Sequence, residues 1–264
     1  MSAAQRIALG DGTELAYRDE GAGAPVLLIH GITENHRAWD ELAERLAGEA
    51  RIVRVDLPGH GASSALPEYS AGALTAAVAR FVSLLQLERP RVIGHSLGGV
   101  VATLLGAFTP VRSVISVDQP LRLGSFIELV RGIAPRLAGS GFLDALSEEL
   151  DSMAGPELPA RLREELRGYR VVERRPVVLG MWLPLVDQTE ERILATLTPL
   201  LDKLEAPYLA LHGLDPGPGY EEWLRAALPK SSVAVELWPG SGHWLHRLAP
   251  DRFAARVREF HAKS

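Results

Sequence analysis

Unbroken apolar runs alternate along this chain with segments in which apolar side chains recur at helical spacing. The run Val26–Ile29 has the pattern of a strand buried on both faces, whereas residues 39–46 carry their apolar side chains on one face of a helix. Strands and helices that alternate in this way are typical of βαβ crossovers and a mostly parallel sheet. Strands are predicted at residues 6–9, 14–18, 26–29, 51–55, 91–93, 113–117, 207–211 and 232–238. Helices are predicted at residues 39–46, 70–87, 97–108, 219–228 and 250–261.

The alternation stops after Asp118 and resumes only in the last quarter of the chain. The intervening part contains helix-like pieces and no clear strand. We therefore expect an α/β core made of residues 1–120 and 191–264, with residues 121–190 inserted as a helical cap. The helix-like pieces are residues 126–136, 141–153 and 159–169.

Composition limits the classes of function. The 264 residues are 47% hydrophobic and carry a net charge of −5, with no basic tract typical of nucleic-acid binding. The absence of cysteine excludes disulfides, thiolate nucleophiles and cysteine-based metal sites. The uncharged stretch at residues 92–111 has a continuous apolar part of about 13 residues, which suits a buried helix better than a membrane span. Residues 1–6 lack the apolar region of a signal peptide, so we expect a cytoplasmic protein that contacts neither membrane nor nucleic acid.

A serine flanked by small residues lies between the strand predicted at 91–93 and the helix predicted at 97–108. The sequence Gly94-His95-Ser96-Leu97-Gly98 is G-x-S-x-G, which in this context presents a nucleophile on a sharp strand-to-helix turn. Glycines leave room for such a turn, and the free N–H groups at the start of the helix favour developing negative charge. An incidental serine in a glycine-rich turn is the alternative interpretation.

Five short motifs occur in order along the chain: His30-Gly31, Asp56-Leu57-Pro58-Gly59-His60-Gly61-Ala62-Ser63, Gly94-His95-Ser96-Leu97-Gly98-Gly99, His212-Gly213 and Gly242-His243. With these motifs the chain resembles the α/β-hydrolase superfamily, in particular its serine esterase and lipase branch, over essentially its whole length. The resemblance implies a mostly parallel eight-stranded sheet flanked by helices, with a helical cap inserted after the sixth strand. It also implies that Ser96 is the nucleophile.

The chain order of this fold puts a histidine base in the loop after the last strand. Of the eight histidines, His243 and His246 lie near that loop, and we expect His243 to be the base because its flanking glycines let the imidazole reach the sheet. No carboxylate motif accompanies the two histidines, so a metal site is not expected there. His95 is adjacent to Ser96, and adjacent side chains cannot make the geometry of a catalytic triad. The other five histidines are expected to be structural or at the surface: His30, His36, His60, His212 and His261.

The resemblance further implies a carboxylate that orients the imidazole. We expect Asp215, after the strand at 207–211, to have this role. It departs from the family pattern, because the acid commonly lies three residues after the glycine and Asp215 lies two after Gly213. Asp118, at the end of the strand at 113–117, is the alternative, since some family members take their acid from that position.

Acyl transfer develops a negative oxygen that two backbone N–H groups normally hold. By resemblance these are the N–H groups of Ile32 and Leu97. The uncharged segment 176–186 has the composition of an apolar lid over Ser96. The expected pocket residues are Phe126, Met181, Trp182 and Trp244.

We therefore expect a serine hydrolase that cleaves a small or medium carboxylic ester or lactone through an acyl-enzyme, without cofactor or metal. Dehalogenases and epoxide hydrolases of this fold use an aspartate nucleophile, and Ser96 argues against both. The alternatives are a carbon–carbon bond hydrolase, a perhydrolase or haloperoxidase, and a ligand receptor that retains the three catalytic residues. The sequence predicts neither the individual substrate nor the oligomeric state.

Overall fold

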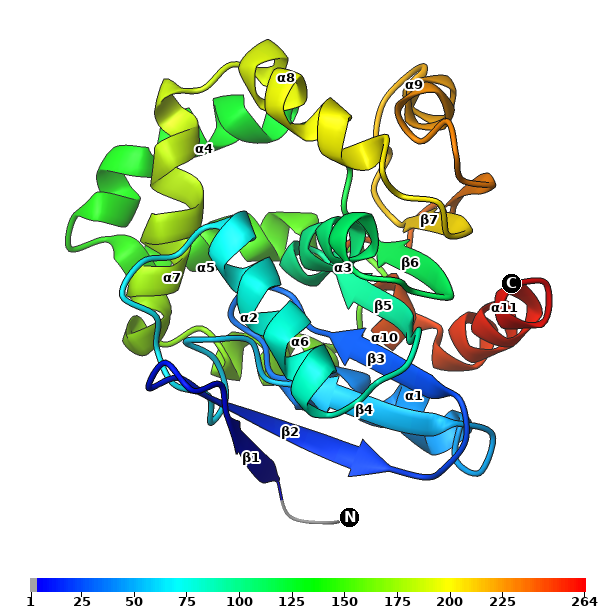
Figure 1. The fold of residues 1–264 in the computed structure, drawn as a ribbon. Coiled ribbons are helices and arrows are strands. Elements are labelled where there is room, and N and C mark those ends of the chain that lie inside the picture. Colours follow the sequence, from blue (N-terminus) through cyan, green and yellow to red (C-terminus); the bar gives the residue numbers. More distant parts are fainter. Residues whose placement is uncertain (1–3) are drawn as a thin grey trace.

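A single mixed sheet runs through the molecule, of which the computed structural model describes residues 4–264 (Figure 1). Its strands are β1 (Gln5–Ala8), β2 (Glu14–Glu20), β3 (Pro25–Ile29), β4 (Arg51–Val55), β5 (Arg91–His95), β6 (Ser113–Val117), β7 (Tyr208–His212) and β8 (Val233–Leu237). They lie in the order β1-β2-β4-β3-β5-β6-β7-β8. The strand β2 pairs antiparallel with β1 and β4, and all other neighbours are parallel. The mostly parallel eight-stranded sheet is thereby confirmed.

Each strand lies where the apolar pattern predicts it, with bounds that differ by at most two residues. The helix predicted at residues 39–46 is present as the short helix α1 (Asp40–Arg45), which follows a 3-10 turn, η1 (His36–Trp39). The other helices outside the long β6–β7 connection are α2 (Ala71–Leu84), α3 (Leu97–Phe108), α9 (Tyr220–Ala227), α10 (Leu245–Leu248) and α11 (Pro250–Ala262).

Alternate side chains of the central strands enter two separate apolar clusters, one on each face of the sheet. In β3, Leu27 and Ile29 belong to the cluster under α2 and α3, while Val26 and Leu28 belong to the cluster under α1 and α11. Because both faces are covered, a central strand has to be apolar at every position. This packing explains the unbroken apolar runs of the sequence.

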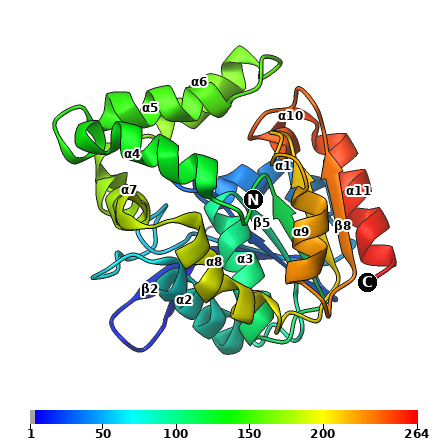
Figure 2. The same ribbon diagram turned by 90° about the horizontal axis from the view of Figure 1, so that it is seen from above.

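The connection between β6 and β7 contains helices and no strand. Its buried side chains, such as Val130, Leu146 and Val178, join the same cluster as α2 and α3. Figure 2 shows α4 to α7 gathered on one side of the molecule, with α8 returning the chain toward α3. The elements are α4 (Gly124–Ala138), α5 (Phe142–Met153), α6 (Ala160–Gly168), η2 (Val172–Arg174), α7 (Arg175–Trp182), η3 (Leu183–Asp187) and α8 (Glu190–Leu201).

Within residues 4–264, no helix has both the length and the apolar character needed to cross a membrane. The prediction about a signal peptide rests on residues 1–6, of which residues 1–3 lie outside the described part of the chain.

Candidate active site

Ser96 lies at the junction of β5 and α3 and is partly exposed. Its backbone has φ 50° and ψ −122°, a conformation that residues other than glycine rarely adopt. The turn is possible only because its neighbours are small. A Cβ on Gly94 would lie 2.0 Å from the carbonyl oxygen of Gly98, and a Cβ on Gly98 would lie 2.2 Å from that of Ile29. The sharp strand-to-helix turn expected from the sequence is therefore present, with its serine side chain at the sheet edge.

A histidine and an aspartate meet beside this turn. The strands β5 and β6 are parallel neighbours, and the Ser96 N–H donates to the Val117 carbonyl oxygen at 2.9 Å. Ser96 and Asp118 therefore lie at the same end of the sheet, where these two parallel strands finish. His243 Nδ1 lies 2.6 Å from Asp118 Oδ2, which leaves Nε2 as the ring nitrogen able to take up a proton.

The structure corrects the expectation that Asp215 is the partner of this histidine. Asp215 lies on an exposed loop, where its Oδ1 accepts the N–H of Gly217 at 2.8 Å. At the end of the sheet where Asp118 lies, the turn after β7 presents backbone N–H groups and not the Asp215 carboxylate. The N–H groups of Gly213 and Leu214 donate to Asp118 Oδ1 at 2.7 and 2.9 Å.

Asp118 is only 3% exposed and has a left-handed φ of 47°. Its N–H donates to the Leu211 carbonyl oxygen at 2.7 Å, so the backbone is held as firmly as the side chain. Burial raises the pKa of Asp118. The hydrogen bond and charge of His243, together with the two backbone donors, outweigh burial and lower that pKa below its ordinary value. The aspartate therefore stays ionised beside the imidazole.

The loop that carries His243 is built on close backbone contacts. Gly242 has φ 62°, and a Cβ there would lie 2.1 Å from the backbone nitrogen of Gly155. The His243 N–H donates to the carbonyl oxygen of Met153 at 2.9 Å. The end of α5 thus holds the backbone of this histidine directly.

The two expected oxyanion donors, Ile32 and Leu97, lie in the turn after β3 and at the start of α3. Leu97 is the first residue of α3, so its N–H has no acceptor within the helix. Ile32 lies in the turn after β3, and the tight approach of Gly98 to the end of β3 brings that turn against the start of α3. Both residues are buried. The geometry is compatible with two N–H groups facing one oxygen.

A buried glutamate that no sequence motif singled out lies behind the histidine. Glu34 Oε2 accepts the Gly31 N–H at 2.8 Å and lies 3.1 Å from His95 Nδ1. Its Oε1 accepts the Trp244 indole N–H at 2.8 Å. Trp244 is thus bound to this carboxylate and is only 3% exposed, so it does not line an open pocket as expected. The position of Glu34 shortly after His30-Gly31 was the only signal, and it is a weak one.

The remaining expected pocket residues belong to the β6–β7 connection. Phe126 and Trp182 pack edge to face, with ring centroids 5.4 Å apart. Both Phe126 and Met181 are partly buried and pack against the main apolar cluster. Phe126 and Trp182 are therefore in direct contact, and the assignment of these three residues to a pocket stays a prediction.

The other histidines are structural in different ways. His30 donates to the Gly31 carbonyl oxygen and accepts the Leu57 N–H, as a backbone-binding histidine should. His36, expected at the surface, is instead buried against Asp56 at 2.8 Å. His212 binds no backbone group and packs edge to face on Tyr220. Within residues 4–264, no cluster of three or more His, Asp or Glu side chains is arranged to hold a metal ion.

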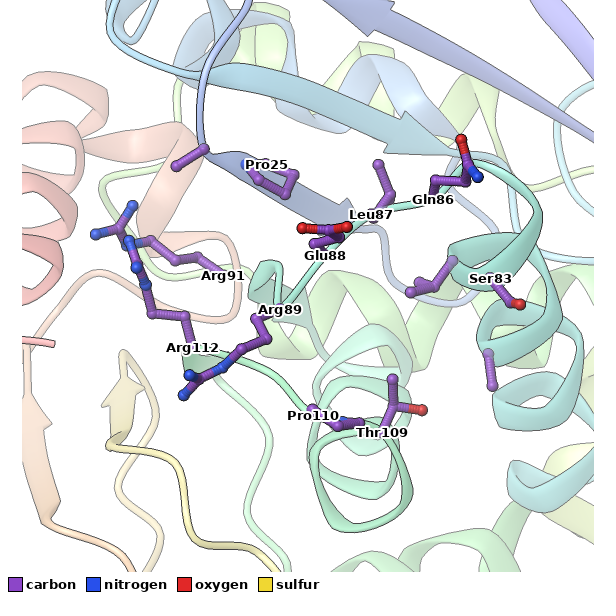
Figure 3. A pocket seen from close by; sticks show the side chains of 13 residues that line it. Pro25, Ser83, Gln86, Leu87, Glu88, Arg89, Arg91, Thr109, Pro110 and Arg112 are labelled. Carbon is purple, nitrogen blue, oxygen red and sulfur yellow. The ribbon is translucent and has the colours of Figure 1, made fainter.

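A cavity of about 720 Å³ lies at the opposite end of the strands, where β3 and β5 begin (Figure 3). Three arginines line it: Arg89, Arg91 and Arg112. Since Ser96 follows the other end of β5, this cavity is remote from the serine, the histidine and the aspartate.

Comparison with known proteins identifies the family. Residues 26–256 match the model of the "Alpha/beta hydrolase family", which is most of the chain. The chain belongs to the alpha/beta hydrolase family. Lipase LipV of Mycobacterium tuberculosis is 30% identical to this α/β hydrolase over 255 residues, covering 89% of this chain and 92% of that one. A thermophilic esterase from Thermogutta terrifontis, solved with malate bound, superimposes with a TM-score of 0.80 at 25% identity and covers 99% of both chains.

A more identical but shorter match is a serine hydrolase-like protein of Danio rerio. It is 41% identical over 101 residues, which is 36% of this chain and 31% of that one. This α/β hydrolase therefore matches only about a third of that relative's length. Together the family model and these relatives place the chain among the α/β hydrolases.

Proposed function

We propose that this α/β hydrolase cleaves a carboxylic ester or lactone through an acyl-enzyme formed on Ser96. The observation that carries the proposal is the 2.6 Å contact between His243 Nδ1 and Asp118 Oδ2 beside the strained serine turn. The names of relatives, a lipase and an esterase, support ester chemistry over the other reactions of this fold.

In the proposed reaction, Ser96 Oγ attacks the ester carbonyl while His243 Nε2 accepts the hydroxyl proton. Asp118 keeps the proton on Nδ1 and stabilises the imidazolium that forms. The N–H groups of Ile32 and Leu97 stabilise the negative oxygen of the tetrahedral intermediate. The intermediate collapses, the ester C–O bond breaks, and His243 returns its proton to the leaving alcohol. A water molecule, deprotonated by the same histidine, then releases the acid from the serine.

The test is pre-steady-state hydrolysis of p-nitrophenyl esters of increasing chain length, with mass spectrometry of the quenched protein. We expect a burst of p-nitrophenol and an acyl adduct on Ser96, neither of which occurs in Ser96→Ala. The best acyl length measures the apolar space beside Phe126 and Trp182.

Two outcomes contradict the proposal. Hydrolysis retained in folded Ser96→Ala would exclude this serine as the nucleophile. A folded wild-type protein that forms no adduct with any ester or lactone, yet is stabilised against heat by such compounds, would favour a ligand receptor.

A further inference from the structure

A second carboxylate–histidine pair lies behind His243, outside the groups that the proposed reaction uses. Glu34 is 2% exposed and His95 is 1% exposed, and Glu34 Oε2 lies 3.1 Å from His95 Nδ1. Three donors converge on this carboxylate, because the Gly31 N–H and the Trp244 indole N–H also bind it at 2.8 Å each. Such a set of donors stabilises an ionised carboxylate in a buried place.

The second ring nitrogen of His95 reaches the backbone of the proposed base. His95 Nε2 lies 2.9 Å from the carbonyl oxygen of His243. A carbonyl oxygen can only accept, so His95 Nε2 has to donate to His243. The other ring nitrogen, Nδ1, faces the Glu34 carboxylate, and the imidazole thereby bridges this carboxylate and the backbone of His243.

The surroundings keep the Glu34 carboxylate ionised and the neighbouring His246 neutral. Burial raises the pKa of Glu34, but the charge and hydrogen bond of His95 hold it well below its ordinary value. The ring of His246 lies 4.5 Å from that of His95 and packs against Trp39 and Phe253. Burial and the positive charge of His95 keep the pKa of His246 well below its ordinary value, so His246 remains neutral.

The backbone of His243 is consequently held on both sides. Its N–H donates to Met153 and its carbonyl oxygen accepts from His95, while its ring donates to Asp118. The first two contacts fix the peptide groups from which the imidazole projects. With them in place, rotation about the side-chain bonds is the only freedom left to Nε2, and Asp118 restricts that rotation.

We propose that Glu34 and His95 are positioning residues for His243: a buried carboxylate–imidazole pair in which the His95 ring donates to the His243 carbonyl and so aims His243 Nε2 at Ser96. Trp244 belongs to the same unit, since its indole N–H binds Glu34 and its ring lies 5.0 Å from that of His243. This inference rests on the proposed function, in which His243 is the base.

A merely structural pair makes a different prediction. Replacing both members of a buried ion pair with uncharged residues is often neutral for stability, because the cost of desolvating the charges disappears with them. The double variant Glu34→Gln/His95→Leu removes the carboxylate and the donor to His243, while the oxygen of the new glutamine amide can still accept from Gly31 or Trp244. If the pair only fills space, activity should survive in this variant.

We expect the double variant to fold and to lose about 10- to 100-fold in kcat with little change in KM, because small misplacements of a catalytic group have effects of this size. The single variant Glu34→Gln should lose less, since neutral His95 can keep its Nε2 proton on the His243 carbonyl. Rates are referred to active sites counted by burst titration. The proton on His243 Nδ1, observed by NMR, should shift or broaden in the double variant.

The matched control is a third buried carboxylate–histidine pair, Asp56 and His36, which are 2.8 Å apart and do not touch His243. The variant Asp56→Asn/His36→Leu should change stability and leave kcat and the His243 proton signal unchanged. Equal losses of kcat in the two double variants would overturn the proposal. So would wild-type kcat and an unshifted signal in Glu34→Gln/His95→Leu. If that variant does not fold, Glu34→Gln alone decides, and an unaltered kcat and signal in it would count against positioning.

The NMR signal does not depend on turnover. If Ser96→Ala retained hydrolysis, the proposed function would fail, while the signal would still report whether Glu34 and His95 hold His243.

Discussion

Two aspartates follow neighbouring parallel strands of this molecule, and their surroundings are opposite. Asp118 follows β6, is buried, and binds one imidazole and two backbone N–H groups. Asp215 follows β7, is exposed, and binds the N–H of Gly217 two residues along its own loop. The second strand therefore supplies the donors for the carboxylate of the first.

The comparison shows that the role of a carboxylate at a strand end depends on which donor groups point toward it. Gly213 donates its N–H to Asp118. It also lies close against the loop of His243, because a Cβ at position 213 would lie 2.0 Å from the carbonyl oxygen of Gly242. The turn after β7 therefore contacts both Asp118 and the loop of His243.

The largest effect is expected from Asp118→Asn. The oxygen of the new amide can keep the two backbone donors, but its NH₂ group then faces His243 Nδ1 and stabilises the wrong tautomer. We expect kcat to fall by about 10⁴-fold with the fold retained, as loss of the acid does in other triads. Ester hydrolysis per titrated active site, with circular dichroism of the variant, measures this. A kcat within about tenfold of the wild type would refute the role of Asp118.

The next effect is expected from Gly213→Ala. The new methyl group collides with the Gly242 backbone, so the His243 loop has to move. We expect about 1–3 kcal/mol of destabilisation and a loss of about 10- to 100-fold in kcat. The matched control is Gly217→Ala, which has an unfavourable φ of 93° but no atom within 4 Å of the new methyl group. It should lower stability without lowering kcat; equal kcat losses would show that the close contact does not matter.

A smaller effect is expected on the free energy of unfolding at low pH. The folded pKa of Asp118 is below its ordinary value of 3.8, so the ionised carboxylate stabilises the fold at higher pH. This contribution is lost as the pH falls below 3.8 and through the folded pKa. We therefore expect the difference in unfolding free energy between wild type and Asp118→Asn to shrink as the pH decreases. Urea unfolding of both proteins across this range measures it, and a constant difference would contradict the argument.

The smallest effect is expected from Asp215→Asn. The amide oxygen can still accept the Gly217 N–H, and nothing else binds this side chain among the described residues. We expect kcat to stay within about twofold and stability within about 0.5 kcal/mol, as is usual for surface substitutions. A loss comparable to that of Asp118→Asn would restore Asp215 as the partner of the base.

The pattern of apolar positions was sufficient to predict the strands of the sheet. A strand that is covered on both faces is an unbroken run of apolar residues, and such a run is visible in the sequence. The positions of Ser96 and His243 could be predicted because each depends on local glycines and chain order. The choice between Asp118 and Asp215 depends on how the turn after β7 packs on β6, which involves residues about 95 positions apart. No local pattern contains that information.

Glu34 was missed for a related reason. Its partners are Gly31, His95 and Trp244, and two of the three are far away in sequence. His95 was set aside because it is adjacent to Ser96 and cannot reach it. In the structure, the His95 ring lies in the interior behind His243, where it contacts Glu34 and the His243 carbonyl oxygen.

The hydrogen bond from His243 to Met153, with the contact of Gly155 on Gly242, has a consequence for protein engineering. The helices between β6 and β7 are a natural target for exchange, because they lie outside the sheet. In this protein they are not an independent module. A chimera that imports these helices has to preserve the backbone path of residues 153–155, or the loop of His243 loses its backbone support.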